Sequence, residues 1–243
     1  MWCGGDQLMV DLQQVQESRI KFWSHTRGQY NGMILLILRD QIKNSSSLCR
    51  INKWPGRSHA VENKVPTTLV YPKNSPYPSS WGFLSENPTE QFAEDKIYWE
   101  WFKTYLDEGR LRLAQERAAR KDANIPVPRS MGEVEKWYQD YLTKLYEHIQ
   151  FRLAASIGQV SWENARIEFI FSVPTTWEHN PTVERFRSII QRSGFSRYPG
   201  HEIKIDLTEA EAAAVWTSKE ISGNFRVFCS PNWMFESNSA NKL

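Results

Sequence analysis

The chain has 243 residues, of which 40% are hydrophobic and 24% are charged. Its 30 Lys and Arg residues against 28 Asp and Glu residues give a formal net charge of +2. This composition is typical of a globular protein and excludes collagen-like, coiled-coil and disordered chains. The near-neutral balance gives no electrostatic reason to expect nucleic acid or a membrane surface as a partner.

Three cysteines stand far apart in the sequence, at Cys3, Cys49 and Cys229. Their odd number, without a basic and then apolar leader after Met1, disfavours a secreted protein built on disulfides. The most apolar run, residues 33–38, is far shorter than the roughly 20 residues that cross a bilayer, and it predicts a buried strand. We therefore expect a cytoplasmic protein without a membrane partner.

The first fifty residues are left unassigned, because residues 8–20 have weak helical character while residues 45–47 and their polar neighbours predict a loop. After them, Trp54-Pro55-Gly56 predicts a turn. Residues 64–71 are β-branched and aromatic and predict a strand, which a proline-rich loop over 72–78 follows. Residues 80–84 form another short apolar segment, which we expect to pair with that strand.

Two helices are predicted next, over residues 96–106 and 133–157, because apolar side chains recur in steps of three and four. A capping box precedes the second helix, with Ser130 and Glu133 placed to satisfy each other's backbone amides. Gly158 predicts its end.

The next segment alternates strands and helices. A strand over residues 167–173 has apolar side chains at every second position, and Asn180-Pro181 opens a helix that Gly194 ends. A strand over 203–207 leads into Thr208-Glu209-Ala210-Glu211, a capping box that opens another helix over the small residues that follow. This order predicts an α/β architecture with helices packed on a sheet.

The usual enzyme motifs are missing from the sequence. It has no H-E-x-x-H, no C-x-x-C and no G-x-S-x-G, so neither a metal site nor a nucleophilic hydrolase is predicted, and no catalytic residue is assigned. It also lacks a Walker A and a G-x-G-x-x-G phosphate loop. We interpret the five isolated histidines as structural or surface residues: His25, His59, His148, His179 and His201.

Two further features have alternative interpretations. Residues 110–121 are rich in arginine and could bind phosphates, but acidic residues interleave with them, which favours a solvated helix or loop. Eleven tryptophans could stack on bases or sugars, which makes a sugar-binding or nucleic-acid-binding protein a weak alternative. We expect Trp99, Trp137 and Trp216 to pack in the core instead.

Three segments together resemble the heat-shock protein 70 family, in its divergent fungal-type branch. They are residues 64–71 with Trp81-Gly82-Phe83-Leu84, residues 171–177, and residues 207–215. The resemblance covers about residues 51–228, which it identifies as a partial actin-like ATPase domain. Residues 229–243 then form a divergent C-terminal tail.

The resemblance implies a ribonuclease H-like first lobe, with a mixed sheet and flanking helices, in a two-lobed domain that clamps Mg-ATP. It also implies that Glu209 lies near a water bound to magnesium. The alternative for Glu209 is a carboxylate at a helix N-terminus, which the helix dipole stabilises.

Several features expected from the family are absent from the sequence. No Asp-x-Gly-Thr-Thr hairpin occurs over residues 1–49, and no Asp-x-Gly-Gly-Gly-Thr loop follows residues 225–228. No equivalent of the family's catalytic lysine is evident after Trp81-Gly82-Phe83-Leu84, and the second lobe is absent. We therefore expect an ATPase-like lobe that does not hydrolyse ATP alone. The alternative is a non-catalytic module that binds another protein through its exposed lobe face.

Overall fold

The computed structural model describes residues 19–26, 29–39, 49–57, 59–60, 62, 64–120, 127–157, 159–177 and 180–211. The strands are β1 (Arg19–Thr26), β2 (Gln29–Arg39), β3 (Cys49–Arg50), β4 (Lys64–Val65), β5 (Thr68–Pro72), β6 (Ser80–Trp81), β7 (Lys96–Glu100), β8 (Arg166–Val173) and β9 (His201–Thr208). The helices are η1 (Gly82–Glu86), α2 (Pro88–Gln91), η2 (Phe102–Leu106), α3 (Glu108–Ala119), α4 (Met131–Ile157), α5 (Gln159–Asn164), α6 (Asn180–Ile190) and η3 (Gln191–Phe195).

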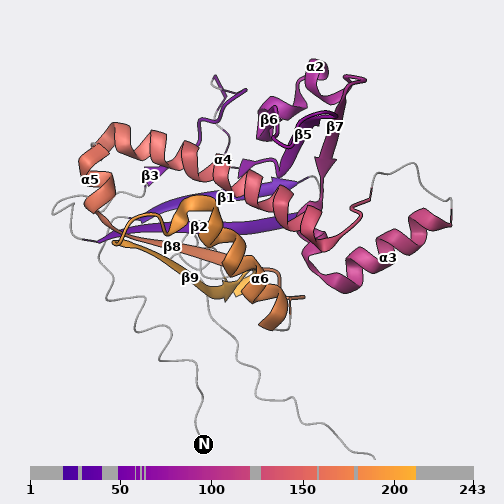
Figure 1. Ribbon diagram of the computed structural model, residues 1–243. Helices are drawn as coiled ribbons and strands as arrows, with labels where there is room; N and C mark the ends of the chain where they lie inside the picture. Colours follow the sequence, from indigo (N-terminus) through magenta and orange to yellow (C-terminus); the bar gives the residue numbers. More distant parts are fainter. Residues whose placement is uncertain are drawn as a thin grey trace, which may run out of the picture.

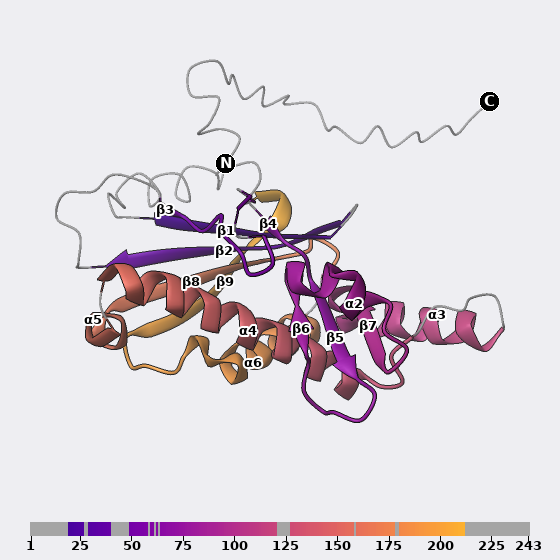
Figure 2. The same cartoon turned by 90° about the horizontal axis from the view of Figure 1, so that it is seen from above.

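The larger sheet runs in the order β3-β1-β2-β8-β9, and β4 also pairs with β1. It is mixed, because β2 pairs antiparallel with β1 and β8 whereas β8 and β9 are parallel. Helices α4 and α6 lie on one face of this sheet (Figures 1 and 2). The predicted α/β architecture with helices on a mixed sheet is confirmed at this level.

The N-terminal strands bear on two of the predictions. The apolar run 33–38 lies within β2, which confirms the predicted strand. The side chains of this run lie outside the described part, so the predicted burial stays a prediction. Arg19 and Ile20 begin β1, at the end of the segment that has weak helical character in the sequence. Residues 1–18 lie outside the described residues.

The long helix α4 confirms the second predicted helix. The Ser130 hydroxyl accepts the backbone N–H of Glu133 at 3.3 Å, as the capping box requires. The Glu133 carboxylate accepts the N–H of Arg129 at 2.7 Å, one residue before the expected donor. Gly158, the predicted end, lies outside the described residues.

The predicted strand over residues 167–173 is β8. Its alternating residues Ile167, Phe169 and Phe171 are buried, as the period-two pattern requires. Helix α6 continues into the π-helical turn η3, where Gly194 adopts a φ of 101° and the helical path ends. A side chain at Gly194 would also come within 3.1 Å of the Tyr146 ring.

A smaller sheet has the order β6-β5-β7 and stands beside the N-terminal half of α4 (Figure 1). Leu69 of β5 pairs with Trp81 of β6, which confirms the predicted pairing of the two apolar segments. The predicted turn at Trp54-Pro55-Gly56 is also present, with Gly56 at a φ of 84°.

The helix predicted over residues 96–106 is wrong. Residues 96–100 form β7, which pairs antiparallel with β5 over its whole length. Trp101 then adopts a left-handed conformation, with a φ of 63°, and the chain turns into the 3-10 helix η2. The aromatic run suits either a strand or a helix, and the pairing with β5 decides between them.

The core under β8 is aromatic. Phe169 lies against the rings of Tyr146, Trp162, Phe195 and His201, with ring centroids 5.0–6.3 Å apart. We call these five residues the aromatic cluster. It joins α4, α5, η3 and both parallel strands.

Trp99 and Trp137 pack on each other, as predicted, with ring centroids 3.9 Å apart. Trp216 lies outside the described residues.

Candidate functional site

The candidate site lies where the parallel strands β8 and β9 end. Val173 and Thr208, their last residues, are paired partners. In α/β sheets, ligands bind outside the carboxyl ends of parallel strands, where the following loops leave the sheet. Here the loop over residues 174–177 follows β8, and Glu209 follows β9.

Lys103 reaches this edge from η2. The left-handed backbone at Trp101 turns the chain away from β7, and Lys103 is then buried, with 3% of its surface exposed. Its Nζ atom donates to Oε1 of Glu209 at 2.5 Å, although the two residues are 106 positions apart in the sequence. The fold therefore brings a buried cation and a carboxylate together at the sheet edge.

The surroundings of the Lys103 ammonium are largely apolar. Its Nζ lies 5.7 Å from the centroid of the Trp177 ring, so the indole face contributes a cation–π contact. Burial lowers the pKa of Lys103, and the neighbouring Glu209 carboxylate opposes that shift. A lysine ammonium has three N–H donors, and within the described part of the chain Glu209 is its one acceptor.

Glu209 is held by the start of the helix that follows β9. The Thr208 hydroxyl accepts the backbone N–H of Glu211 at 3.2 Å, and the Glu211 carboxylate accepts the Thr208 N–H at 2.8 Å. The predicted capping box is therefore present, and its carboxylate belongs to Glu211. The Thr208 N–H and hydroxyl both donate to the Glu211 carboxylate, and these two bonds lower the pKa of Glu211. The helix expected beyond residue 211 lies outside the described residues.

Glu209 has a different role from Glu211. It stands in the first turn, where the helix dipole favours a negative charge, as the alternative interpretation expects. Its Oε1 atom faces Lys103 rather than a backbone amide, and 18% of its side chain is exposed. The Glu209 carboxylate thus contacts the buried Lys103 ammonium and is itself partly accessible to solvent.

Tyr138 of α4 lies near this pair. Its ring stacks on Phe186 and meets Phe102 edge to face. Burial raises the pKa of Tyr138 well above its usual value, with smaller contributions from Tyr141 and Glu209. The phenol is therefore neutral and forms an apolar wall of the site.

Three histidines of the described residues do not belong to this site. The Nε2 atom of His201 lies 3.0 Å from the carbonyl oxygen of Trp162 in the aromatic cluster, and burial lowers the His201 pKa. His148 packs beside Trp54, and His59 is exposed. These three fit the structural or surface roles expected of them.

The side chain of His25 and the residue His179 lie outside the described part. No group of three or more His, Cys, Asp or Glu residues that could hold a metal ion occurs among the described residues.

The sequence did not identify Lys103 as a site residue. It stands between Phe102 and the buried Leu106, in a segment whose neighbours are aromatic. A single lysine inside an apolar run is a usable signal, because lysine is almost never fully buried unless it is paired. Its partner, however, could be found only in three dimensions.

Within the described residues, no helix combines the length and the apolar character needed to cross a membrane. Comparisons of the chain with protein-family models, with curated proteins and with solved structures give no significant match.

Proposed function

We propose that this chain is an ATP-binding, chaperone-like relative of the heat-shock protein 70 family that carries one lobe of an actin-like ATPase domain. We further propose that it binds a magnesium nucleotide beside Lys103 and Glu209 and does not hydrolyse it alone. The observation that carries the proposal is the buried Lys103–Glu209 pair at the carboxyl edge of β8 and β9.

A buried ion pair is a weak contributor to stability, and this supports a role in binding. Desolvation of two charges can exceed their attraction, and well-packed apolar residues often replace such a pair without loss. Lys103 could pack as an apolar residue between Trp177 and the core. Its charge is therefore better explained by a ligand that it contacts.

The donors present suit the phosphate end of a magnesium nucleotide. Magnesium binds phosphate oxygens, waters and one or two carboxylates, so it needs no cage made wholly of protein. Lys103 would hold a phosphate oxygen, and Glu209 would hold a water bound to the metal. When bound, the nucleotide would supply the phosphates and the metal charge, while Tyr138 and Trp177 keep the buried side of the site apolar.

Binding without hydrolysis follows from the groups available. Phosphoryl transfer depends on positioning and on stabilising charge around the transferred group. Glycine-rich loops supply several backbone N–H donors for this purpose, and the sequence contains neither loop expected of the family. Lys103 and Glu209 alone provide one cation and one carboxylate.

The test is thermal unfolding of the full chain with and without Mg-ATP. A ligand that binds only the folded state raises the free energy of unfolding, by about 2.7 kcal/mol when its concentration is one hundred times its Kd. The melting temperature rises with it. We expect a rise for the parent chain and none for Lys103→Met. The matched control is Lys144→Met, because Lys144 is an exposed lysine paired with Glu147. An unchanged melting temperature in the parent, or an equal rise in Lys103→Met, would refute the proposed site.

A non-catalytic interaction role is the second candidate. It is favoured by α3, a helix of 12 residues whose one buried side chain is Leu111. Such a helix contributes little to the core and presents most of its surface to a partner.

A further inference from the structure

Helix α3 projects from the body of the molecule beside the smaller sheet (Figures 1 and 2). It is joined to the core through Leu111 and through ion pairing of Glu108 with Arg185. Isolated helices of this length are only marginally stable in water. Contacts along its exposed surface would therefore stabilise it.

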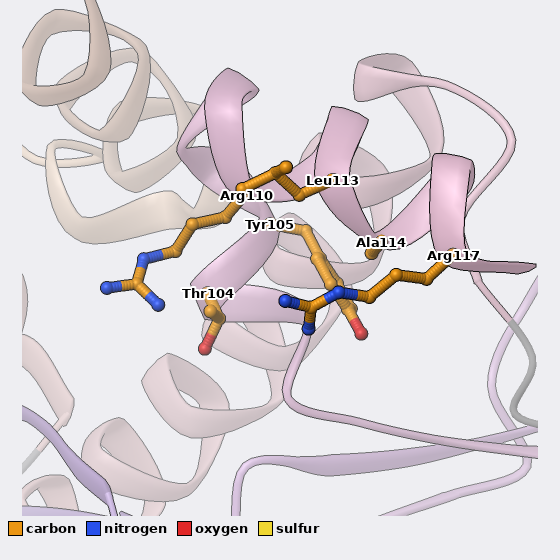
Figure 3. Close-up of a pocket in the computed structure, with 6 residues that line it drawn as sticks. All are labelled: Thr104, Tyr105, Arg110, Leu113, Ala114 and Arg117. Carbon is orange, nitrogen blue, oxygen red and sulfur yellow. The ribbon is translucent and has the colours of Figure 1, made fainter. Parts of the chain in front are cut away.

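A pocket of about 220 Å³ lies between α3 and η2. Its lining residues are Thr104, Tyr105, Arg110, Leu113, Ala114 and Arg117. Figure 3 shows the arginine side chains extending toward the same side of the pocket, beside Thr104 and Tyr105. The volume is below the 300–1,000 Å³ usual for small-molecule sites, so it suits a few side chains better than a whole cofactor.

Several described arginines pair with acidic side chains. Arg112 pairs with Glu116, and Arg185 pairs with Glu108. Neither the Arg110 nor the Arg117 guanidinium has an acidic partner within 4.0 Å among the described residues. The Asp107 carboxylate accepts the backbone N–H of Arg110 at 3.0 Å, and burial, followed by the charge of Glu100, raises the pKa of Tyr105.

The spacing of these charges limits the ligand. Arg110 and Arg117 are seven residues apart on one helix face, which corresponds to roughly 10 Å along the axis. Two carboxylates four residues apart on an extended chain lie on the same face and span about 13 Å, at about 3.3 Å per residue, which long arginine side chains can meet. Leu113 lies between the arginines and is 50% exposed, so it can receive an aliphatic side chain placed between the two carboxylates.

We propose that the Arg110–Arg117 pocket binds an acidic segment of a partner protein, with two carboxylates four residues apart and an aliphatic residue midway between them on the same face. The arginine forks hold the carboxylates, and Leu113 and Ala114 receive the aliphatic side chain. This inference deepens the interaction role and is independent of nucleotide binding, because η2 directs Lys103 toward Glu209 and directs Thr104 and Tyr105 toward this pocket.

The experiment measures fluorescence anisotropy of a labelled peptide containing Glu-Ala-Leu-Ala-Glu with the full chain at low salt. The comparison peptide has Gln at both Glu positions. We expect binding of the acidic peptide alone, weakened by added salt. The double variant Arg110→Gln with Arg117→Gln should weaken it about tenfold, as for the loss of two exposed ion pairs.

The matched control is Arg112→Gln with Arg120→Gln, which removes the same charge from α3 and its C-cap residue outside the pocket. It should weaken binding less than about threefold, in line with screened charges at a distance. Equal weakening by both double variants would overturn the proposal, as would equal binding of the two peptides. A third measurement uses inorganic pyrophosphate in place of the peptide. If the chain binds pyrophosphate and does not bind the peptide, the proposal is overturned in favour of a phosphate site. Nucleotide-dependent melting of the same variants separates this result from the Lys103–Glu209 site.

Discussion

The aromatic cluster and the Lys103–Glu209 pair are both buried beside strands β8 and β9, but they are built differently. In the cluster, rings such as Phe169 and Phe195 meet edge to face, and polar atoms such as Nδ1 of His201 are buried among them. At the sheet edge, an ammonium and a carboxylate occupy space that apolar side chains could fill. The first region contributes stability by packing, whereas the second gives up stability to keep charges in place. The difference identifies the sheet edge as the place to look for function.

The largest expected effect comes from opening the aromatic cluster. Phe169 is fully buried and contacts four other rings, so Phe169→Ala removes apolar area and leaves a cavity. We expect a loss of about 3–5 kcal/mol in the free energy of unfolding, measured by urea denaturation. Phe92→Ala is the control, because Phe92 is 75% exposed, and it should change stability by less than about 0.5 kcal/mol. Comparable losses in both variants would contradict the packing described for β8.

The next effect separates the charged pair from the packing around it. Glu209→Gln leaves the Lys103 ammonium buried beside a neutral acceptor, and we expect a loss of about 2–3 kcal/mol. The double variant Lys103→Met with Glu209→Gln removes the uncompensated charge and should recover most of that stability. Urea denaturation of the single and double variants measures both values.

The contrast with binding makes this prediction sharper. The double variant should show no rise in melting temperature with Mg-ATP even though its stability is restored. A double variant that stays as unstable as Glu209→Gln would mean that the pair is part of the structural core. In that case the distinction between the two regions would fail.

The two regions also differ in how far the sequence predicts them. β8 and α4 were predicted because their apolar residues repeat with periods of two and of three to four, which follow from backbone geometry. The segment 96–106 was predicted wrongly, because its aromatic residues suit a strand as well as a helix. Its pairing with β5 decides the structure of residues 96–100. Neither the left-handed Trp101 nor the pocket beside α3 has a sequence signal, since both depend on how neighbouring elements pack.

Of the two charged residues of the candidate site, the sequence pointed to Glu209 and not to Lys103. Glu209 was identified through the resemblance, and the capping box around it through a local pattern. Lys103 is 106 positions away, and local patterns contain no information on contacts at that separation. A buried charge in an apolar run indicates that some partner exists, but only the fold supplies its identity.

A smaller effect tests the polar member of the aromatic cluster. Burial lowers the pKa of His201, so the folded state favours the neutral ring, whereas an unfolded histidine protonates near pH 6.5. The unfolded state therefore binds more protons below that pH, and stability should fall as the pH drops from 7 to 5. One proton contributes a slope of at most about 1.4 kcal/mol per pH unit.

Urea denaturation across this pH range measures the slope, and His201→Gln should reduce it. Part of the slope should remain, because burial also lowers the pKa of His148, which titrates in the same direction. The slope should therefore be smallest in the double variant His148→Gln with His201→Gln, with a remainder near pH 5 from carboxylates such as Glu90 and Glu211, whose lowered pKa values act in the same direction. A slope unchanged by His201→Gln would show that the cluster does not keep this ring neutral.

The smallest effect concerns the cap that positions Glu209. Thr208→Ala removes the hydroxyl that accepts the Glu211 N–H, and loss of such a cap costs about 1 kcal/mol. Thr208→Ser keeps the hydroxyl and is the control. If the cap orients Glu209 toward Lys103, Thr208→Ala should also reduce the melting shift with Mg-ATP, whereas Thr208→Ser should preserve it. A full shift in Thr208→Ala would mean that the ion pair itself, and not the cap, fixes the Glu209 carboxylate at the sheet edge.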